Sequence, residues 1–166
     1  MEVALSAADC QVLALAEALR SRGGRLATAE SCTGGLIAAA CTALPGSSEW
    51  FECGFVTYSN AAKTEMLGVA QQLIVTFGAV SAEVAAAMAE GALARSQASL
   101  AVACTGIAGP GGATQGKPVG TVWLAIAAAG MPTRTALLRL DGSRTAIRER
   151  TVSEAIDRLT AAVLQD

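Results

Sequence analysis

The run TAESCTGG at Thr28–Gly35 joins a short apolar strand to an apolar helical stretch at Leu36–Leu44. It places a hydroxyl and a thiol side by side at a glycine turn that leads into a helix. The start of a helix presents unpaired backbone N–H groups and the positive end of its dipole. A nucleophile at this turn would therefore have donors for an oxyanion beside it. The N–H groups that we expect to face a substrate are those of Thr33, Gly34 and Gly35.

The rest of the chain alternates helical and strand patterns until a hairpin near its end. We expect helices over Ser6–Arg22, Leu36–Leu44, Ala61–Leu67 (capped by Asn60), Gln71–Phe77 and Ala82–Arg95, and from Ser143 onward. We expect strands over Arg25–Ala29, Trp50–Tyr58, Leu100–Cys104, Val119–Ala128 and Thr133–Leu140. This order predicts an α/β fold, a three-layer sandwich whose mixed, mostly parallel central sheet is flanked by helices. Because no linker or repeat interrupts residues 1–166, we expect a single domain.

Composition narrows the classes of partner. Charged residues make up 16% of the chain, against about 25% in a typical soluble domain. A surface so poor in charge suggests that other copies cover part of it, so we expect a homo-oligomer, a dimer or larger. The net charge of −2 and the scattered arginines exclude a basic nucleic-acid footprint. The apolar stretches are too short or too interrupted by glycine to predict a membrane span.

The chain has five cysteines, no C-x-x-C spacing and no histidine. This pattern predicts no metal site and is typical of reduced thiols in the cytoplasm. Without histidine, a base for a serine nucleophile has to be a lysine, a tyrosine or a carboxylate.

Two neighbouring residues compete for the role of nucleophile. Cys32 has the better intrinsic nucleophile, but cysteines are often simply buried. Ser31 fits the position of a nucleophile at the turn, but serine at such a position is more often a helix cap. The residues alone leave these alternatives open.

Tyr58 and Lys63 form the second candidate group. Tyr58 is the only tyrosine of the chain and Lys63 is one of its two lysines. Tyr58 ends a predicted strand, and Lys63 follows shortly after it. Burial lowers the pKa of a lysine, so Lys63 could act as a general base for Ser31, with the phenol of Tyr58 sharing or relaying the proton. The alternative is an exposed lysine on the first turn of a short helix.

The end of another buried strand contributes Thr105, which could bind a substrate or a neighbour of the nucleophile. The glycine-dense loop at Gly106–Gly120 follows it. This loop nearly matches a P-loop, but Pro118 stands where the motif needs a hydroxyl, and a strand follows instead of a helix. Its backbone could still bind an anion through Gly109, Gly111 and Gly112. Arg144 lies at the start of the last helix, where the dipole disfavours a cation, so we expect it to bind a phosphate.

Six segments together resemble the C-terminal domain family of the competence/damage-inducible protein CinA. They are Thr28–Gly35 (TAESCTGG), Pro45–Ser48 (PGSS), Gly54–Asn60 (GFVTYSN), Gly78–Ser81 (GAVS), Thr105–Gly112 (TGIAGPGG) and Lys117–Trp123 (KPVGTVW). Each motif alone is weak evidence for the family. The resemblance is specific because all six motifs occur in order and at family-like spacing. The chain departs from the family pattern at Ala61, Ser99 and Ala113.

The resemblance implies an enzyme, a nicotinamide-nucleotide amidase that needs no metal or cofactor. It would hydrolyse the carboxamide of nicotinamide mononucleotide to nicotinate mononucleotide and ammonia, in pyridine nucleotide salvage. Ser31 resembles the family nucleophile and Lys63 and Tyr58 its activating partners, while Thr105 and Arg144 match further family positions. A non-catalytic nucleotide-binding module is the alternative.

Overall fold

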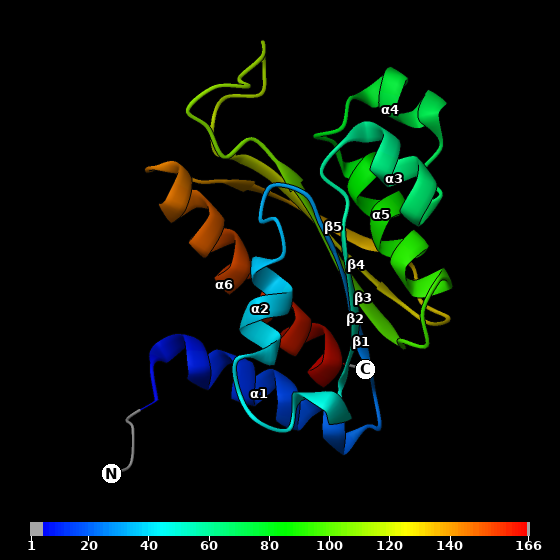
Figure 1. Cartoon of the computed structure of the whole chain (residues 1–166), viewed down its shortest axis with the longest axis vertical. Helices are drawn as coiled ribbons and strands as arrows, with labels where there is room; N and C mark the ends of the chain where they lie inside the picture. The colour runs from blue at the N-terminus through cyan, green and yellow to red at the C-terminus, as the bar shows by residue number, and fades with distance from the viewer. Residues whose placement is uncertain (1–4, 166) are drawn as a thin grey trace.

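The computed structural model describes residues 5–165, which form a three-layer α/β sandwich (Figure 1). The strands are β1 (Leu26–Glu30), β2 (Phe51–Val56), β3 (Leu100–Gly106), β4 (Thr121–Ala128) and β5 (Arg134–Arg139). They form one sheet in the order β2-β1-β3-β4-β5. β1 pairs in parallel with β2 and β3, whereas β4 runs antiparallel to both of its neighbours. The predicted mixed, mostly parallel sheet is confirmed.

The helices cover both faces of the sheet. They are α1 (Ala7–Ser21), α2 (Leu36–Thr42), α3 (Asn60–Leu67), α4 (Gln71–Phe77), α5 (Ala82–Ala94) and α6 (Arg144–Gln165), with a 3₁₀ turn at Ser47–Glu49. Figure 1 shows α1, α2 and α6 on one face and α3, α4 and α5 on the other. No helix among residues 5–165 is both long and apolar enough to cross a membrane.

The two faces bury different side chains. The core beneath α1, α2 and α6 contains large residues such as Leu15, Ile37 and Leu159. The core beneath α5 is rich in alanine, which lets that helix lie close to the sheet. A Cβ on Gly91 of α5 would lie 2.1 Å from the carbonyl oxygen of Leu67. Glycine at this position therefore allows α3 to rest directly on α5.

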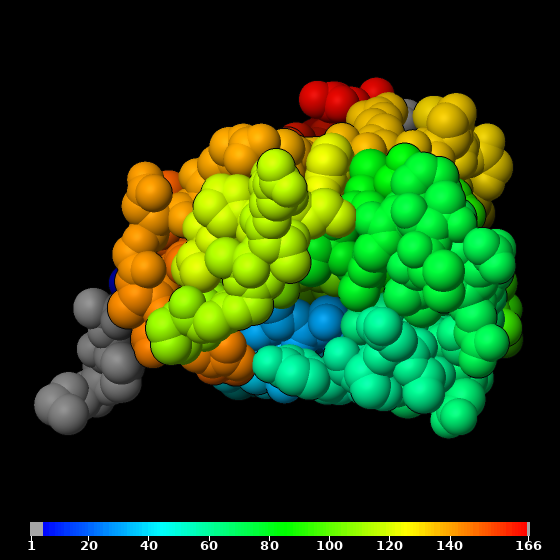
Figure 2. All heavy atoms as spheres, turned by 90° about the horizontal axis from the view of Figure 1, so that it is seen from above, coloured from blue at the N-terminus to red at the C-terminus, as the bar shows by residue number. Residues whose placement is uncertain are grey.

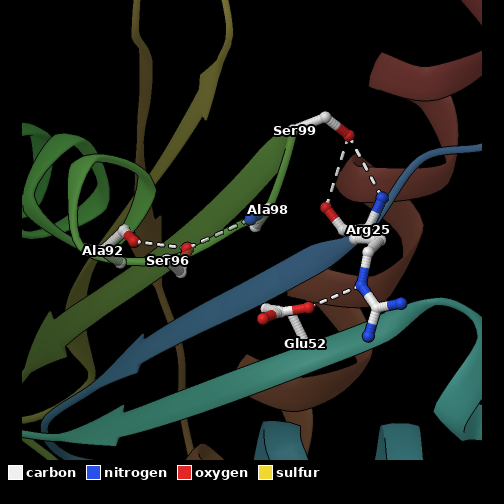
Figure 3. Close-up of polar contacts among 6 residues, drawn as sticks. All are labelled: Arg25, Glu52, Ala92, Ser96, Ala98 and Ser99. Carbon is white, nitrogen blue, oxygen red and sulfur yellow. Dashed lines mark hydrogen bonds and ion pairs between the residues drawn. The ribbon is translucent and has the colours of Figure 1, made fainter.

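Polar contacts link the amino ends of β1, β2 and β3 (Figure 3). The Arg25 guanidinium pairs with Glu52 beside the start of β2. The Arg25 N–H donates to Ser99 Oγ at 3.1 Å, just before β3. At the opposite edge Glu30 pairs with Val56 of β2 and with Cys104 of β3, so the carboxyl ends of the three strands come level.

Local features differ from the sequence prediction at two places near that edge. The predicted strand to Tyr58 ends at Val56, so Tyr58 lies outside the sheet. The cap of α3 is Ser59 and not Asn60, because the Ser59 hydroxyl accepts the Ala62 N–H at 3.0 Å. Two adjacent residues that both favour caps left this choice ambiguous in sequence.

Candidate active site

The carboxyl ends of β1, β2 and β3 meet at a pocket of about 210 Å³. In parallel sheets this edge is where ligands bind. In Figure 2 the β1–α2 segment is visible at the floor of a hollow, between the loop after β3 and the helices α3 and α4. The pocket is lined by Ser31, Cys32, Tyr58, Asn60, Lys63, Ala79, Val80, Thr105, Gly106, Ala108 and Arg144.

Ser31 and Lys63 come together in this pocket. Lys63 lies on the first turn of α3, and its Nζ is 3.2 Å from Ser31 Oγ. The same nitrogen donates to the carbonyl oxygens of Thr57 at 2.8 Å and Tyr58 at 3.3 Å. An ammonium has three donors, so these acceptors hold the side chain in one orientation. Lys63 is only 1% exposed, which excludes the alternative of a solvated surface lysine.

Burial lowers the pKa of Lys63 below its usual value, because the ammonium form loses its hydration. The nearby thiols of Cys104 and Cys32 oppose this shift when they ionise. A lowered pKa raises the fraction of neutral amine at physiological pH. That form can accept a proton from the Ser31 hydroxyl.

The Cys32 thiol lies in the same pocket but in a different electrostatic state. A hydrogen bond with the Cys104 thiol and burial both raise its pKa well above the usual value. The thiol is the poor nucleophile and the thiolate the good one. A raised pKa therefore weighs against Cys32 and in favour of Ser31.

A buried carboxylate organises the turn that follows Ser31. Glu30 is fully buried, and its Oε1 accepts the Thr33 hydroxyl at 2.6 Å and the Ile37 N–H at 2.8 Å. Its Oε2 accepts the Ala38 N–H at 3.0 Å. The start of α2 is thus capped by Glu30 from within the protein, so these helix N–H groups are not available to a substrate.

The N–H groups that we expect to face the substrate, those of Thr33, Gly34 and Gly35, differ from the Ile37 and Ala38 N–H groups that Glu30 binds. None of the three lines the pocket. Thr33 is fully buried, and the Gly34 N–H donates to the Ser31 carbonyl at 3.0 Å. The pocket instead contains Cys32, whose N–H has no hydrogen-bond partner within residues 5–165 other than its own thiol.

Tyr58 and Arg144 form the opposite, exposed side of the pocket. The Tyr58 hydroxyl accepts from Arg144 Nη2 at 3.0 Å, and Arg144 Nη1 donates to the Gly109 carbonyl at 2.8 Å. The Tyr58 hydroxyl has no hydrogen bond to Ser31 or Lys63 in the described part of the chain. The predicted proton relay through the phenol is thus not formed, and Tyr58 contacts Lys63 through its backbone carbonyl.

Thr105 and the glycine loop take positions that the sequence did not resolve. The Thr105 hydroxyl lines the pocket and donates to the Ala79 carbonyl at 2.8 Å, which ties β3 to the segment before α5. Gly109 is buried, whereas Gly111 and Gly112 are exposed, and none of them lines the pocket. The predicted anion cradle thus lies outside the pocket lining, and Arg144 contacts it at the Gly109 carbonyl.

Comparison with known proteins identifies the family. Residues 11–163 match the sequence profile of the CinA C-terminal domain. The chain belongs to the CinA C-terminal domain family. A nicotinamide-nucleotide amidohydrolase PncC of Pseudomonas putida is 53% identical over 145 residues, which are 87% of this chain and 90% of that protein. The Escherichia coli protein of the same name is 45% identical over 162 residues, 95% and 98% of the two chains.

Other members of the CinA family are longer. A CinA-like protein of Akkermansia muciniphila is 55% identical over 132 residues, 80% of this chain and 32% of its own length. Among solved structures, the competence/damage inducible protein CihA from Agrobacterium tumefaciens superposes with a TM-score of 0.91 at 46% identity. The match covers 97% of this chain and 98% of that one.

Two residues of this CinA domain escaped the functional prediction. Glu30 was visible in sequence as a carboxylate at the end of an apolar strand, a placement that requires buried partners. Arg148 donates from Nε to the Cys32 carbonyl and from Nη2 to the Thr33 carbonyl, both at 3.1 Å. Like Arg144, it lies near the start of a helix, where the dipole disfavours a cation.

Proposed function

We propose that this protein hydrolyses the carboxamide of nicotinamide mononucleotide to nicotinate mononucleotide and ammonia. The observation that carries the proposal is the 3.2 Å contact between Lys63 Nζ and Ser31 Oγ inside a pocket at the sheet edge. The substrate is suggested by two relatives named nicotinamide-nucleotide amidohydrolase, which match this chain over nearly their whole length.

In the proposed reaction, neutral Lys63 accepts the proton of Ser31 as Oγ attacks the amide carbon. The negative charge that forms on the carbonyl oxygen is stabilised by the Cys32 N–H, a contribution of roughly 3–4 kcal/mol for one such donor. Lys63 then gives its proton to the leaving nitrogen, which departs as ammonia. Water attacks the resulting ester, Lys63 takes a proton from it, and Ser31 regains its hydroxyl.

The phosphate of the substrate would bind at the exposed side of the pocket. Arg144 is the basic side chain there, and its guanidinium already donates to two neutral oxygens. A phosphate that replaced the Tyr58 hydroxyl would form a stronger, charge-assisted bond. Arg144 would thus bind the nucleotide end while Ser31 and Lys63 act on the amide.

The deciding experiment measures ammonia release from nicotinamide mononucleotide by the wild type, Ser31→Ala and Cys32→Ala. Activity in the wild type and Cys32→Ala, with none in Ser31→Ala, would support a serine amidase. Loss of ammonia release in Cys32→Ala alone would indicate that the Cys32 thiol is the nucleophile. Nucleotide binding without ammonia from the wild type would favour a non-catalytic binding module.

The proposal extends to the setting of the enzyme, a homo-oligomer in the cytoplasm that serves pyridine nucleotide salvage. Low surface charge and the exposed apolar side chains Val75 and Phe77 support self-association. Light scattering of the purified protein would test it, since a monomer at micromolar concentration would contradict the assembly. Cell fractionation would test the compartment, and growth on the nucleotide as pyridine source would test the pathway.

A further inference from the structure

Arg148 contacts two successive carbonyl groups of the turn that carries Ser31. It extends from α6, 116 residues further along the chain than Cys32. Its Nε and Nη2 bind the carbonyls of Cys32 and Thr33 in the manner of a fork. No carboxylate pairs with Arg148 within residues 5–165, so both interactions draw on an uncompensated guanidinium.

These contacts determine where the N–H groups of the turn point. A trans peptide is planar, and its C=O and N–H point in opposite directions. Arg148 holds the carbonyls of Cys32 and Thr33, which orients the N–H of Thr33 and of Gly34 away from it. The Gly34 N–H in turn holds the Ser31 carbonyl at 3.0 Å. The peptide between Ser31 and Cys32 is thereby fixed, and with it the Cys32 N–H.

The turn at Gly34 lies in contact with the Arg148 guanidinium. Gly34 has a φ of +59°, and a Cβ there would lie 3.5 Å from Arg148 Nη2. Arg148 is half-buried, so its hydrogen bonds are partly shielded from water. Two carbonyl acceptors offset the unfavourable placement of a cation near the start of α6.

We propose that Arg148 is a positioning residue that holds the Cys32 N–H in place for the oxyanion. The inference rests on the proposed amidase function, and it assigns to Arg148 no contact with the substrate. It predicts an effect on the rate of the chemical step and not on the binding of the nucleotide.

The test compares Arg148→Lys and Arg148→Gln with Arg150→Gln, which alters an exposed arginine on the same helix. Misplacing an oxyanion donor should lower kcat by about tenfold to hundredfold, with KM within about threefold of the wild type. Lysine keeps the charge without the fork, so Arg148→Lys should also lose activity. Arg150→Gln should match the wild type. Melting temperatures within about 4 °C would show that the variants remain folded.

Two further measurements separate positioning from general destabilisation. Guanidinium added to Arg148→Ala should restore kcat in a saturable manner and leave Arg150→Ala unchanged. The rate at which a fluorophosphonate labels Ser31, with loss of fluoride, should fall in the Arg148 variants alone. This labelling needs no amide substrate.

The outcomes are distinct. A wild type that is labelled but releases no ammonia would overturn the proposed function and leave the labelling rates to judge Arg148. A kcat and a labelling rate within about twofold of the wild type in both Arg148 variants would overturn the positioning role. So would a change confined to KM, which would make Arg148 a substrate-binding residue.

Discussion

The two sides of the pocket differ in burial and in what holds their polar groups. Ser31 and Lys63 form the nucleophile end, where the side chains are 9% and 1% exposed. Tyr58 and Arg144 form the arginine end, where Tyr58 is 60% exposed. Electrostatic interactions are stronger away from water, so the buried end suits bond making and breaking. The exposed end can exchange water for a phosphate at low cost.

This difference predicts how variants should divide. Changes at the nucleophile end should lower kcat or stability, because its groups are fixed by buried hydrogen bonds. Changes at the arginine end should act on KM for the nucleotide. A variant at the arginine end that lowers only kcat, or a variant at the nucleophile end that changes only KM, would contradict the comparison.

The largest effect is expected at Lys63. Lys63→Arg keeps the charge but cannot give up its proton, and Lys63→Met keeps most of the stem without a base. Both should reduce kcat by roughly 10⁴-fold or more, measured as ammonia release at saturating nucleotide. Lys117→Met is the matched control, since this other lysine binds the Phe77 carbonyl outside the pocket. More than about 1% activity in Lys63→Arg would exclude lysine as the base.

The support beneath the nucleophile end should be nearly as sensitive. Glu30→Gln keeps the shape but turns an amide N–H₂ toward backbone donors at Ile37 and Ala38. We expect it to lower the free energy of unfolding by about 2–4 kcal/mol, measured by urea denaturation. Glu154→Gln, which breaks an exposed pair with Arg158, should cost less than about 0.5 kcal/mol. Equal changes in the free energy of unfolding for the two variants would mean that Glu30 does not support the start of α2.

At the arginine end, Arg144→Met should lower kcat/KM for nicotinamide mononucleotide by about tenfold to hundredfold, the worth of a bond to a charged group. The loss should lie in KM. In the same variant, kcat/KM for the matching nucleoside, which lacks the phosphate, should change little. If the nucleoside suffered equally, Arg144 would act on the ring or the amide and the division between the two ends would fail.

The pH profile tests the electrostatics of the nucleophile end. Because burial lowers the pKa of Lys63, kcat/KM should rise with pH by up to about tenfold per unit and level off below pH 10.5, the usual value. In the window between the folded and unfolded pKa values, the unfolded chain binds more protons, so stability should also rise with pH. Lys63→Met should lose this part of the stability change. A flat wild-type stability profile across that window would contradict the shift.

The smallest expected effect is the difference in stability between two glycine variants, one in the turn after Ser31 and one in the exposed loop after β3. Gly34→Ala places a side chain at a positive φ beside Arg148 and should cost about 1–2 kcal/mol. Gly111→Ala has open space around its Cβ and no positive φ, so it should stay within about 0.5 kcal/mol. Thermal unfolding of both variants measures the difference, and equal values would mean that the turn is not constrained.

The sequence predicted the layers, and it made Ser31 and Lys63 candidates for one site because each follows a predicted strand. The contact between them is a finding of the structure. It could not predict the partners of Arg148, since nothing local specifies a contact between α6 and a turn more than a hundred residues away. The expected start of α2 at Leu36 is confirmed, but the sequence did not reveal that its N–H groups are already bound. A helix cap read from neighbours cannot reveal that Glu30, six residues before the helix, reaches its N–H groups.

Lys63 has a second task that follows from how little of α3 is buried. The buried side chains of this helix are Lys63 and Leu67. The amine that is proposed to move protons therefore also helps to attach α3 to the rest of the protein. During each turnover, the helix is held in turn by a neutral amine and by an ammonium. Turnover and the local stability of α3 are thus linked through one side chain, and a slow opening of this helix would silence the enzyme without unfolding it.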